Sequence, residues 1–260
     1  MNSALELKDI SFTYASSETM LFKEFSLEVK VGEFFGIIGP NGSGKTTLLK
    51  LMQGFLKPQK GSIFIFSQAI DKFNRRELAK IIGYVPQENF FAFEYTVFDV
   101  VLWGRNPYLG RLENPKKDDL TKVMEALTIT DTIALKDKSI NQISAGERQR
   151  VVLARALAQQ PKILLLDEAT THLDITHQVE FARILKKLNN LGLTIIFLSH
   201  DLNLAGLICS RMLLLDNGKP VACDRPEIIL RSELIEKVYR VKPYLQNHPA
   251  SGLPQIILPL

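Results

Sequence analysis

The sequence has few cysteines, no long apolar run and no basic tract. Its 2 cysteines, Cys209 and Cys223, match no metal-binding or redox spacing, so free thiols in a cytosolic chain are expected. No apolar run approaches the roughly 18 residues that a membrane helix needs, and the first residues lack the apolar segment of a signal peptide. The formal net charge of +4 comes without a lysine- or arginine-rich run, so no nucleic-acid partner is expected.

The sequence does contain strand and helix patterns that change character in the middle of the chain. Residues 4–14 and 22–29 alternate apolar and polar side chains, which predicts antiparallel strands with one solvated face. Between 88 and 156 the strand patterns fade. Other strands are predicted at 34–38, 63–66, 81–85, 163–166, 194–198, 212–215 and 221–223, and helices at 46–53, 75–80, 97–104, 118–127, 145–159, 175–190, 226–230 and 232–239.

The order of these elements predicts a single α/β domain over residues 1–240. Its core, at 1–87 and 157–240, carries a small antiparallel part and is interrupted by a helical insertion at 88–156. Residues 241–260 show no clear period and are left as a tail of unknown role.

The clearest motif is a glycine-rich turn between a predicted buried strand and a predicted helix. It matches the phosphate-binding loop, in which backbone N–H groups surround anionic oxygens at a helix N-terminus. We expect Lys45 to reach the β- and γ-phosphates and the Thr46 hydroxyl to bind Mg²⁺. The alternative, a chance glycine-rich turn, does not explain the flanking strand and helix. The loop residues expected to bind nucleotide are Gly39, Pro40, Asn41, Gly42, Ser43, Gly44, Lys45, Thr46 and Thr47.

Two carboxylates follow another predicted buried strand. Asp167 and Glu168 end the run 162–168, which places them at the carboxyl edge of the sheet, where ligands of parallel α/β sheets bind. Asp167 can support Mg²⁺, and Glu168 can polarise the attacking water as a general base. A solvated acidic turn would look the same in isolation, but the phosphate-binding loop favours the functional interpretation.

A third motif indicates a family. Residues 143–150, Ile-Ser-Ala-Gly-Glu-Arg-Gln-Arg, open a predicted helix and resemble the signature of ATP-binding cassette (ABC) ATPases. The resemblance spans about residues 10–217 and implies a P-loop NTPase (RecA-like) core with a small antiparallel β-subdomain and an inserted α-helical subdomain. Further positions in the order of the family are Tyr14, which resembles the adenine-stacking aromatic, Gln87 of the Q-loop, His172-Leu173-Asp174 of the D-loop, and His200, the switch histidine.

The resemblance implies how these residues work. Family members pair head to tail and sandwich two ATP molecules, so the signature of one copy closes on the γ-phosphate held by the other. Ser144 and the N–H groups after it form that second anion site. The residues expected to act in catalysis are Glu168, His200 and Gln87; those expected to bind nucleotide outside the loop are Tyr14, Ser144, Ala145, Gly146, Glu147 and Asp174; those expected to hold Mg²⁺ are Thr46, Gln87 and Asp167.

The sequence departs from the family pattern at a few positions. Ala145 replaces a glycine of the signature, and its methyl group is expected either to crowd the phosphate or to stiffen the helix start. Ile143 replaces a leucine of the signature. Ala169 replaces a proline after Glu168, and this change is expected to matter little. His172 and His177 lack the spacing of a metal-binding pair, so no metal is expected there.

The resemblance also implies partners. A lone cassette is most similar to bacterial or archaeal importers, whose ATPase lies at the cytoplasmic face of the membrane on a separate permease, supplied by a substrate-binding protein. Residues 103–110 and 173–178 resemble the branch that imports iron–siderophore complexes, haem or cobalamin, although Gly, Asn and Pro punctuate any helix boundary. The alternatives are a soluble ABC protein, a different cargo, or a simple P-loop kinase, which would need no signature.

Four aromatic residues after Gln87 suggest where the permease docks. Residues 90–95 hold so many rings that some are expected to be exposed, the usual mark of an interaction site. We expect 88–108, with Phe91, Phe93 and Arg105, to form a groove for a cytoplasmic helix of the permease. The alternative is that the rings pack between core and insertion.

Overall fold

The computed structural model describes residues 2–16, 18–87, 89–110, 113–171 and 173–259. The chain forms two compact units, Met1–Lys72 with Thr194–Leu260, and Phe73–Leu193. We call the first the loop unit, because it contains the phosphate-binding loop, and the second the helical unit. The domain limits predicted from the sequence stay a prediction.

An antiparallel sheet begins the loop unit. Its strand order is β2-β1-β4-β5, with β1 at Ser3–Phe12, β2 at Phe22–Lys30, β4 at Lys60–Ile65 and β5 at Gln68–Ala69. Buried positions along β2 are separated by exposed ones, because one face of the sheet packs on apolar side chains while the other meets water. The alternation seen in the sequence therefore predicted these first two strands correctly.

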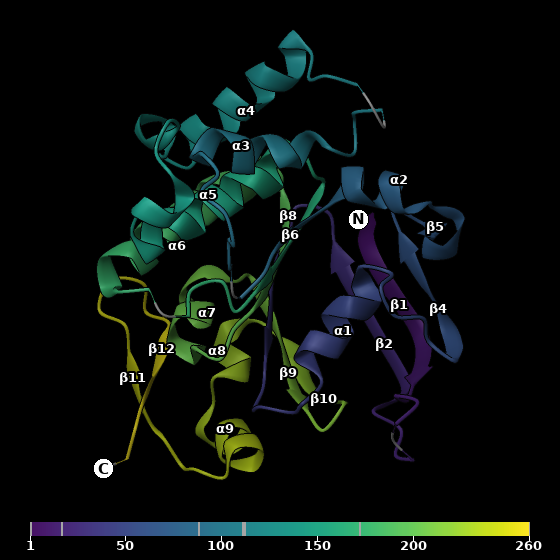
Figure 1. Cartoon of the computed structure of the whole chain (residues 1–260). Helices are drawn as coiled ribbons and strands as arrows, with labels where there is room; N and C mark the ends of the chain where they lie inside the picture. The colour runs from purple at the N-terminus through teal and green to yellow at the C-terminus, as the bar shows by residue number, and fades with distance from the viewer. Residues whose placement is uncertain (1, 17, 88, 111–112, 172, 260) are drawn as a thin grey trace. The chain divides into compact units, whose positions relative to one another are not determined.

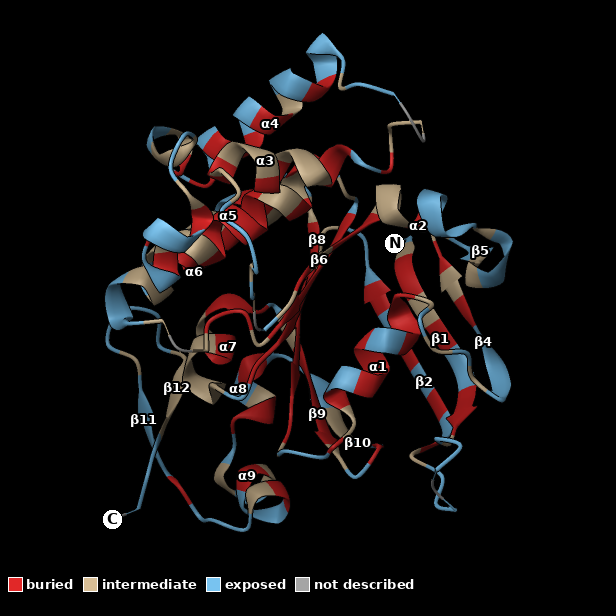
Figure 2. Cartoon of the chain, viewed as in Figure 1, coloured by how far each residue is buried: buried red, intermediate tan, exposed pale blue. Residues whose placement is uncertain are grey.

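Buried parallel strands carry the phosphate-binding loop. β3 (Phe34–Ile38) pairs in parallel with β8 (Thr194–Leu198) and with β9 (Arg211–Asp216). Every residue of β3 and β8 is buried, and β8 and β9 are largely red in Figure 2. β10 (Lys219–Asp224) returns antiparallel to β9 through Asn217 and Gly218, which are both at positive φ and form the tight turn of a hairpin.

Helices and a terminal hairpin complete the loop unit. The sequence predicted α1 (Lys45–Met52), α8 (Pro226–Ile229) and α9 (Ser232–Tyr239), but not α7 (Leu202–Ile208). The C-terminal residues form a hairpin of β11 (Tyr244–Asn247) and β12 (Pro254–Ile257), which Figure 1 shows near the C-terminus. The Asn203 side chain on α7 donates to the Ile256 carbonyl at 3.1 Å and accepts from the Ile256 N–H at 2.7 Å. This paired contact fastens the hairpin to α7.

The helical unit combines two parallel strands with a group of helices. β6 (Ile82–Val85) pairs in parallel with β7 (Ile163–Asp167). The helices are α2 (Arg75–Ile81), α3 (Val97–Leu102), α4 (Lys117–Ile129), α5 (Ala145–Ala158) and α6 (Ile175–Asn190), with short 3₁₀ turns η1 at Ile70–Lys72 in the loop unit and η2 at Trp103–Arg105, η3 at Ile133–Leu135 and η4 at Ile140–Gln142 in the helical unit.

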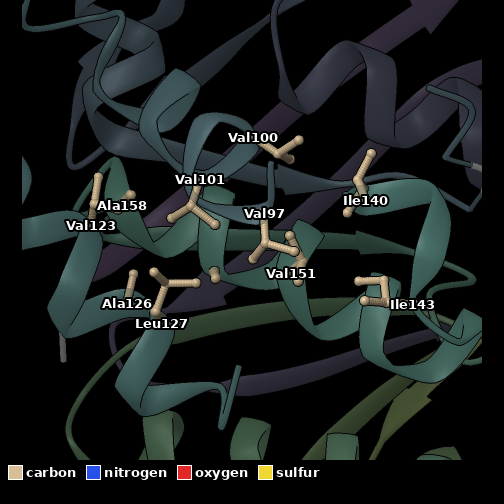
Figure 3. Close-up of a cluster of buried hydrophobic side chains, with 11 residues drawn as sticks. Val97, Val100, Val101, Val123, Ala126, Leu127, Ile140, Ile143, Val151 and Ala158 are labelled. Atoms are coloured by element: carbon tan, nitrogen blue, oxygen red, sulfur yellow. The ribbon is translucent and has the colours of Figure 1, made fainter. Parts of the chain in front are cut away.

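One apolar cluster holds α3, α4 and α5 together. Its side chains meet from all three helices and from the segment before α5, as Figure 3 shows. Ile143 belongs to the cluster and is buried, so the residue that precedes the signature anchors the start of α5. The members are Val97, Val100, Val101, Val123, Ala126, Leu127, Ile140, Ile143, Val151, Ala154 and Ala158.

Arg105 contradicts one expectation. We expected Arg105 to line an exposed docking groove, but the residue is only 2% exposed. Its Nε donates to Asp119 Oδ1 at 2.8 Å, its NH1 donates to the Ala158 carbonyl at 2.8 Å, and its guanidinium stacks on the Tyr108 ring at 3.8 Å. The neighbouring Gly104 packs so closely on α5 that a Cβ there would lie 2.2 Å from the Arg155 carbonyl. This segment therefore fastens η2 to α4 and α5.

Candidate functional site

The phosphate-binding loop lies between β3 and α1, as predicted. Gly39, Gly42 and Gly44 all have positive φ, which glycine adopts without strain. A Cβ on Gly39 would also lie 2.2 Å from the Leu215 carbonyl, so only glycine fits the first position. Gly44 is the N-cap of α1, and the first-turn N–H groups of a helix have no intrahelical partners. The loop therefore presents backbone donors at the positive end of a helix.

The polar side chains of the loop suit an anionic ligand. The Lys45 ammonium donates to the Gly39 carbonyl at 2.8 Å and the Pro40 carbonyl at 3.0 Å, and so lies across its own loop. The Ser43 hydroxyl is buried and has no hydrogen-bond partner among the described residues. A buried hydroxyl without a partner is costly, which is a reason to expect a ligand. The donors of this loop therefore fit phosphate oxygens.

His200 and Tyr14 lie in the same unit as the loop. The register of the parallel pair, Ile37 opposite Leu198, puts the carboxyl ends of β3 and β8 at one edge. The loop follows the first of these strands and His200, which is exposed, follows the second. Tyr14 follows β1, and its hydroxyl lies 2.9 Å from Thr47 Oγ1. Tyr14 as a whole residue is 38% exposed, which leaves it accessible to a stacking base.

Gln87, Asp167 and Glu168 meet in the helical unit, at the carboxyl ends of β6 and β7. The Gln87 side-chain amide donates to Glu168 Oε2 at 3.1 Å. Glu168 has φ 47, in the left-handed region that non-glycine residues rarely adopt. Such strain often lies at functional sites. The residue expected to act as general base therefore has a strained backbone and a side chain held by a neighbour.

Tyr84 is a member of this group that the sequence analysis missed. It lies on β6, and its hydroxyl donates to Asp167 Oδ2 at 3.4 Å. Burial, together with the Asp167 carboxylate, raises the pKa of Tyr84 to about 12. The phenol thus stays protonated and holds the Asp167 carboxylate in place. Its position, three residues before Gln87 on a strand parallel to β7, was the signal available in the sequence.

The signature forms a capping box at the start of α5. Ser144 Oγ accepts from the Glu147 N–H at 3.2 Å, while Glu147 Oε2 accepts from the Ser144 N–H at 2.8 Å. These bonds to Ser144 hold the pKa of the Glu147 carboxyl below its ordinary value. The Ser144 hydroxyl accepts in the box and so keeps its own proton for donation to an anion. Ala145 is exposed, so its methyl group displaces no neighbouring side chain.

A cavity of about 310 Å³ joins the Q-loop side of the helical unit to the signature. The side chain of Asn89 donates to Gln149 Oε1 at 3.0 Å, whereas Gln149 Nε2 is buried and unpaired among the residues described. The cavity therefore brings together three of the predicted motifs. Its lining residues are Gln87, Asn89, Phe90, Ala145, Arg148, Gln149, Thr171 and Leu173.

Asp174 is the N-cap of α6. Its Oδ1 accepts from the His177 N–H at 2.9 Å, so the side chain caps a helix in this chain. His172 lies outside the described residues.

The donors expected for Mg²⁺ are distributed over both units. Thr46 belongs to the loop unit, whereas Gln87 and Asp167 belong to the helical unit. Hydroxyl, amide and carboxylate oxygens are the ligands that Mg²⁺ accepts, and this ion is usually bound through substrate phosphates and few protein groups. The donor set therefore fits the ion.

Comparisons with known proteins agree with these motifs. Residues 22–171 match the model of the family described as ABC transporter. The chain is 38% identical over 245 residues to an uncharacterized ABC transporter ATP-binding protein of Bacillus subtilis, YvrA, covering 93% of this chain but only 55% of that relative. It is 34% identical to the ferric enterobactin transport ATP-binding protein FepC of Escherichia coli, covering 98% of this chain and 94% of the relative.

The fold also matches a solved transporter structure. An inward-facing conformation of a metal-chelate type ABC transporter, described there as putative, contains a chain that aligns with a TM-score of 0.88 at 28% identity. The alignment covers 100% of this chain and 98% of the other. The C-terminal hairpin is thus inside the region of likeness. Among the residues described, no helix is long and apolar enough to cross a bilayer.

Proposed function

Because the chain belongs to the ABC transporter family, we propose that it is the ATP-hydrolysing subunit of an importer, working as a pair that shares two ATP sites. The observation that carries this proposal is the hydrogen bond between Gln87 and the strained Glu168. This contact supports the proposed roles, because the residue expected to act as general base lies next to one able to hold the attacking water. The phosphate-binding loop carries donors that fit phosphate oxygens.

Each residue has a defined task in the proposed reaction. Lys45 exchanges its two carbonyl partners for phosphate oxygens and neutralises their charge. Glu168 accepts a proton from water as the water attacks, while Gln87 orients the carboxylate. His200 donates to the γ-phosphate and stabilises the charge that develops there. Bound Mg²⁺ would supply further neutralisation of the phosphates, held by Thr46, Asp167 and Gln87.

The pair follows from the signature. Ser144 and the first turn of α5 form an anion site in the helical unit, while the same chain holds a phosphate-binding loop in its other unit. We assign the signature and Asp174 to the ATP bound by the second copy, as the family resemblance implies. The proposed partners are therefore a second copy of this chain and a permease, with a substrate-binding protein acting on the permease.

The proposed cargo is an iron–siderophore complex, haem or cobalamin. Support comes from the relative named for ferric enterobactin and from the metal-chelate transporter. Gly104 and Arg105 add little support for this cargo, because their packing contacts already explain why these residues are present.

The proposed permease contact lies at the cytoplasmic face of the membrane. Phe90 and Phe93, which are 90% and 68% exposed, support it. Co-purification with a membrane permease separates this proposal from a soluble ABC protein.

Changing Lys45 tests the nucleotide site. Lys45→Ala removes the cation of the loop, and hydrogen bonds to a charged group contribute roughly 1.5–3 kcal/mol. ATP affinity, measured by calorimetry on the purified chain, should therefore fall about tenfold to a hundredfold. Lys50→Ala, at an exposed position later in α1, is the matched control and should bind ATP normally. Unchanged affinity in the Lys45 variant would contradict the proposed nucleotide site.

A further inference from the structure

The ring of His177 lies directly on the glycine of the signature. A Cβ added to Gly146 would lie 2.2 Å from two carbon atoms of the His177 ring. No larger residue fits at 146 while the ring stays in place, whereas the adjacent Ala145 is exposed. The signature therefore needs a glycine at this position because of a contact within its own chain.

Polar contacts hold the same ring between two helices. His177 Nδ1 lies 3.2 Å from Arg150 NH1 on α5 and 3.3 Å from Glu180 Oε2 on α6. Arg150 and Glu180 also form an ion pair with each other. The side chains of Arg150 and His177 are 10% and 26% exposed, whereas that of Glu180 is 43% exposed, so the group is buried on the α5 side and open to water at Glu180. α5 and α6 are thus tied together within their first two turns.

These first turns carry two of the predicted ATP-site elements. α5 starts with the signature, and α6 starts at Asp174, whose carboxylate accepts from the His177 N–H. One residue therefore contacts the signature through its ring and Asp174 through its backbone. A shift of either helix start would change the spacing between the signature and Asp174.

We propose that His177 is a positioning residue that holds the signature and Asp174 together as one surface. This surface serves the ATP held by the second copy and not the ATP held by its own chain. This inference rests on the proposed shared site. It differs from simple packing in one respect: the defect of a His177 variant must appear in the partner's ATP site.

Loss of the ring should separate ATP binding from turnover. His177→Ala removes the ring that packs on Gly146, so the signature can shift. A misplacement of the signature by about 1 Å is enough to slow catalysis by roughly a hundredfold. ATP affinity of the isolated chain should stay within about twofold, because Lys45 and its loop are untouched. ATPase activity should fall about tenfold or more. His177→Phe keeps a ring on Gly146 and should recover most of the activity.

Mixing two inactive chains provides the decisive test. In a mixed dimer, one ATP site combines the intact phosphate-binding loop of the His177→Ala chain with the intact signature of the Lys45→Ala chain. ATPase activity of the mixture should therefore exceed that of either chain alone. Absence of recovery would overturn the inference, as would full activity of the His177→Ala chain or a His177→Phe chain as inactive as His177→Ala.

A second mixture tests the shared site independently. Ser144→Arg blocks the signature directly, so Ser144→Arg with Lys45→Ala should recover activity for the same reason. If ATPase activity recovers in this mixture but not in the His177→Ala mixture, the role of His177 is contradicted and the shared site is not. Failure of both mixtures contradicts the shared site on which the inference rests. Arg183→Ala, at an exposed position of α6, is the matched control and should show wild-type activity in every assay.

Discussion

Some functional residues can be recognised from a sequence motif. The role of others depends on contacts with residues of other helices and strands. Lys45 and Glu168 belong to the first kind, because their neighbours in sequence already define a loop or a strand end. Tyr84 and His177 belong to the second kind. Their partners, Asp167 and Gly146, lie 83 and 31 positions away in the chain. No period or spacing in the sequence reports such a contact.

Arg105 shows how a charged residue misleads when its burial is unknown. Its ion pair with Asp119 is almost fully buried, with side-chain exposures of 3% and 7%. The pKa of the Asp119 carboxyl is lowered: burial opposes the charge, but the Lys116 N–H and the Arg105 guanidinium outweigh it. A groove lined by Arg105 is therefore excluded, and its side chain stabilises the packing of η2, α4 and α5.

Charge reversal at this position should destabilise the fold. Arg105→Glu leaves two buried carboxylates without a cation, and breaking a buried pair costs about 3–5 kcal/mol. Urea unfolding followed by circular dichroism should show that loss in the helical unit. Arg183→Glu, at an exposed position of α6, should change the unfolding free energy by less than about 0.5 kcal/mol. Equal stability of the two variants would contradict the structural role of Arg105.

Among the elements, alternating and wholly apolar strands were predictable, whereas the exposed strand β11 and the helix α7 were not. β1, β2, β3 and β8 have strong periods because one or both faces are buried. β11 is exposed along its whole length, so its sequence carries no burial pattern. α7 has the sequence Leu-Asn-Leu-Ala-Gly-Leu-Ile, which is apolar apart from Asn203, so it shows no alternation of apolar and polar faces that would indicate a helix. Both were assigned only through their three-dimensional contacts.

The hairpin should depend on Asn203. Two four-residue strands are marginal alone, and the Asn203 amide supplies both a donor and an acceptor to Ile256. Asn203→Leu leaves that backbone pair unsatisfied, so hydrogen exchange at the Ile256 amide should become about tenfold faster. Asn247→Leu, on the exposed strand β11, is the matched control. Unchanged protection in the Asn203 variant would show that apolar packing alone holds the hairpin.

At the scale of the whole molecule, the account depends on two copies of the chain. The family match covers residues 22–171, and the shared ATP site explains why one chain carries a phosphate-binding loop and a second anion site at the start of α5. In the proposed shared site, the signature contacts the ATP held by the second copy. Formation of the ATP-bound pair is therefore the central claim.

The mass of Glu168→Gln in Mg-ATP tests this claim most directly. Glutamine cannot accept the proton from water, so hydrolysis should slow by about 10²–10⁴ while ATP binding persists. The ATP-bound pair should then accumulate, and light scattering should give twice the 29.3 kDa of one chain. Adding Ser144→Arg should return the mass to that of a monomer. A Glu168→Gln chain that stays monomeric in Mg-ATP, or hydrolyses ATP at the wild-type rate, would contradict the account.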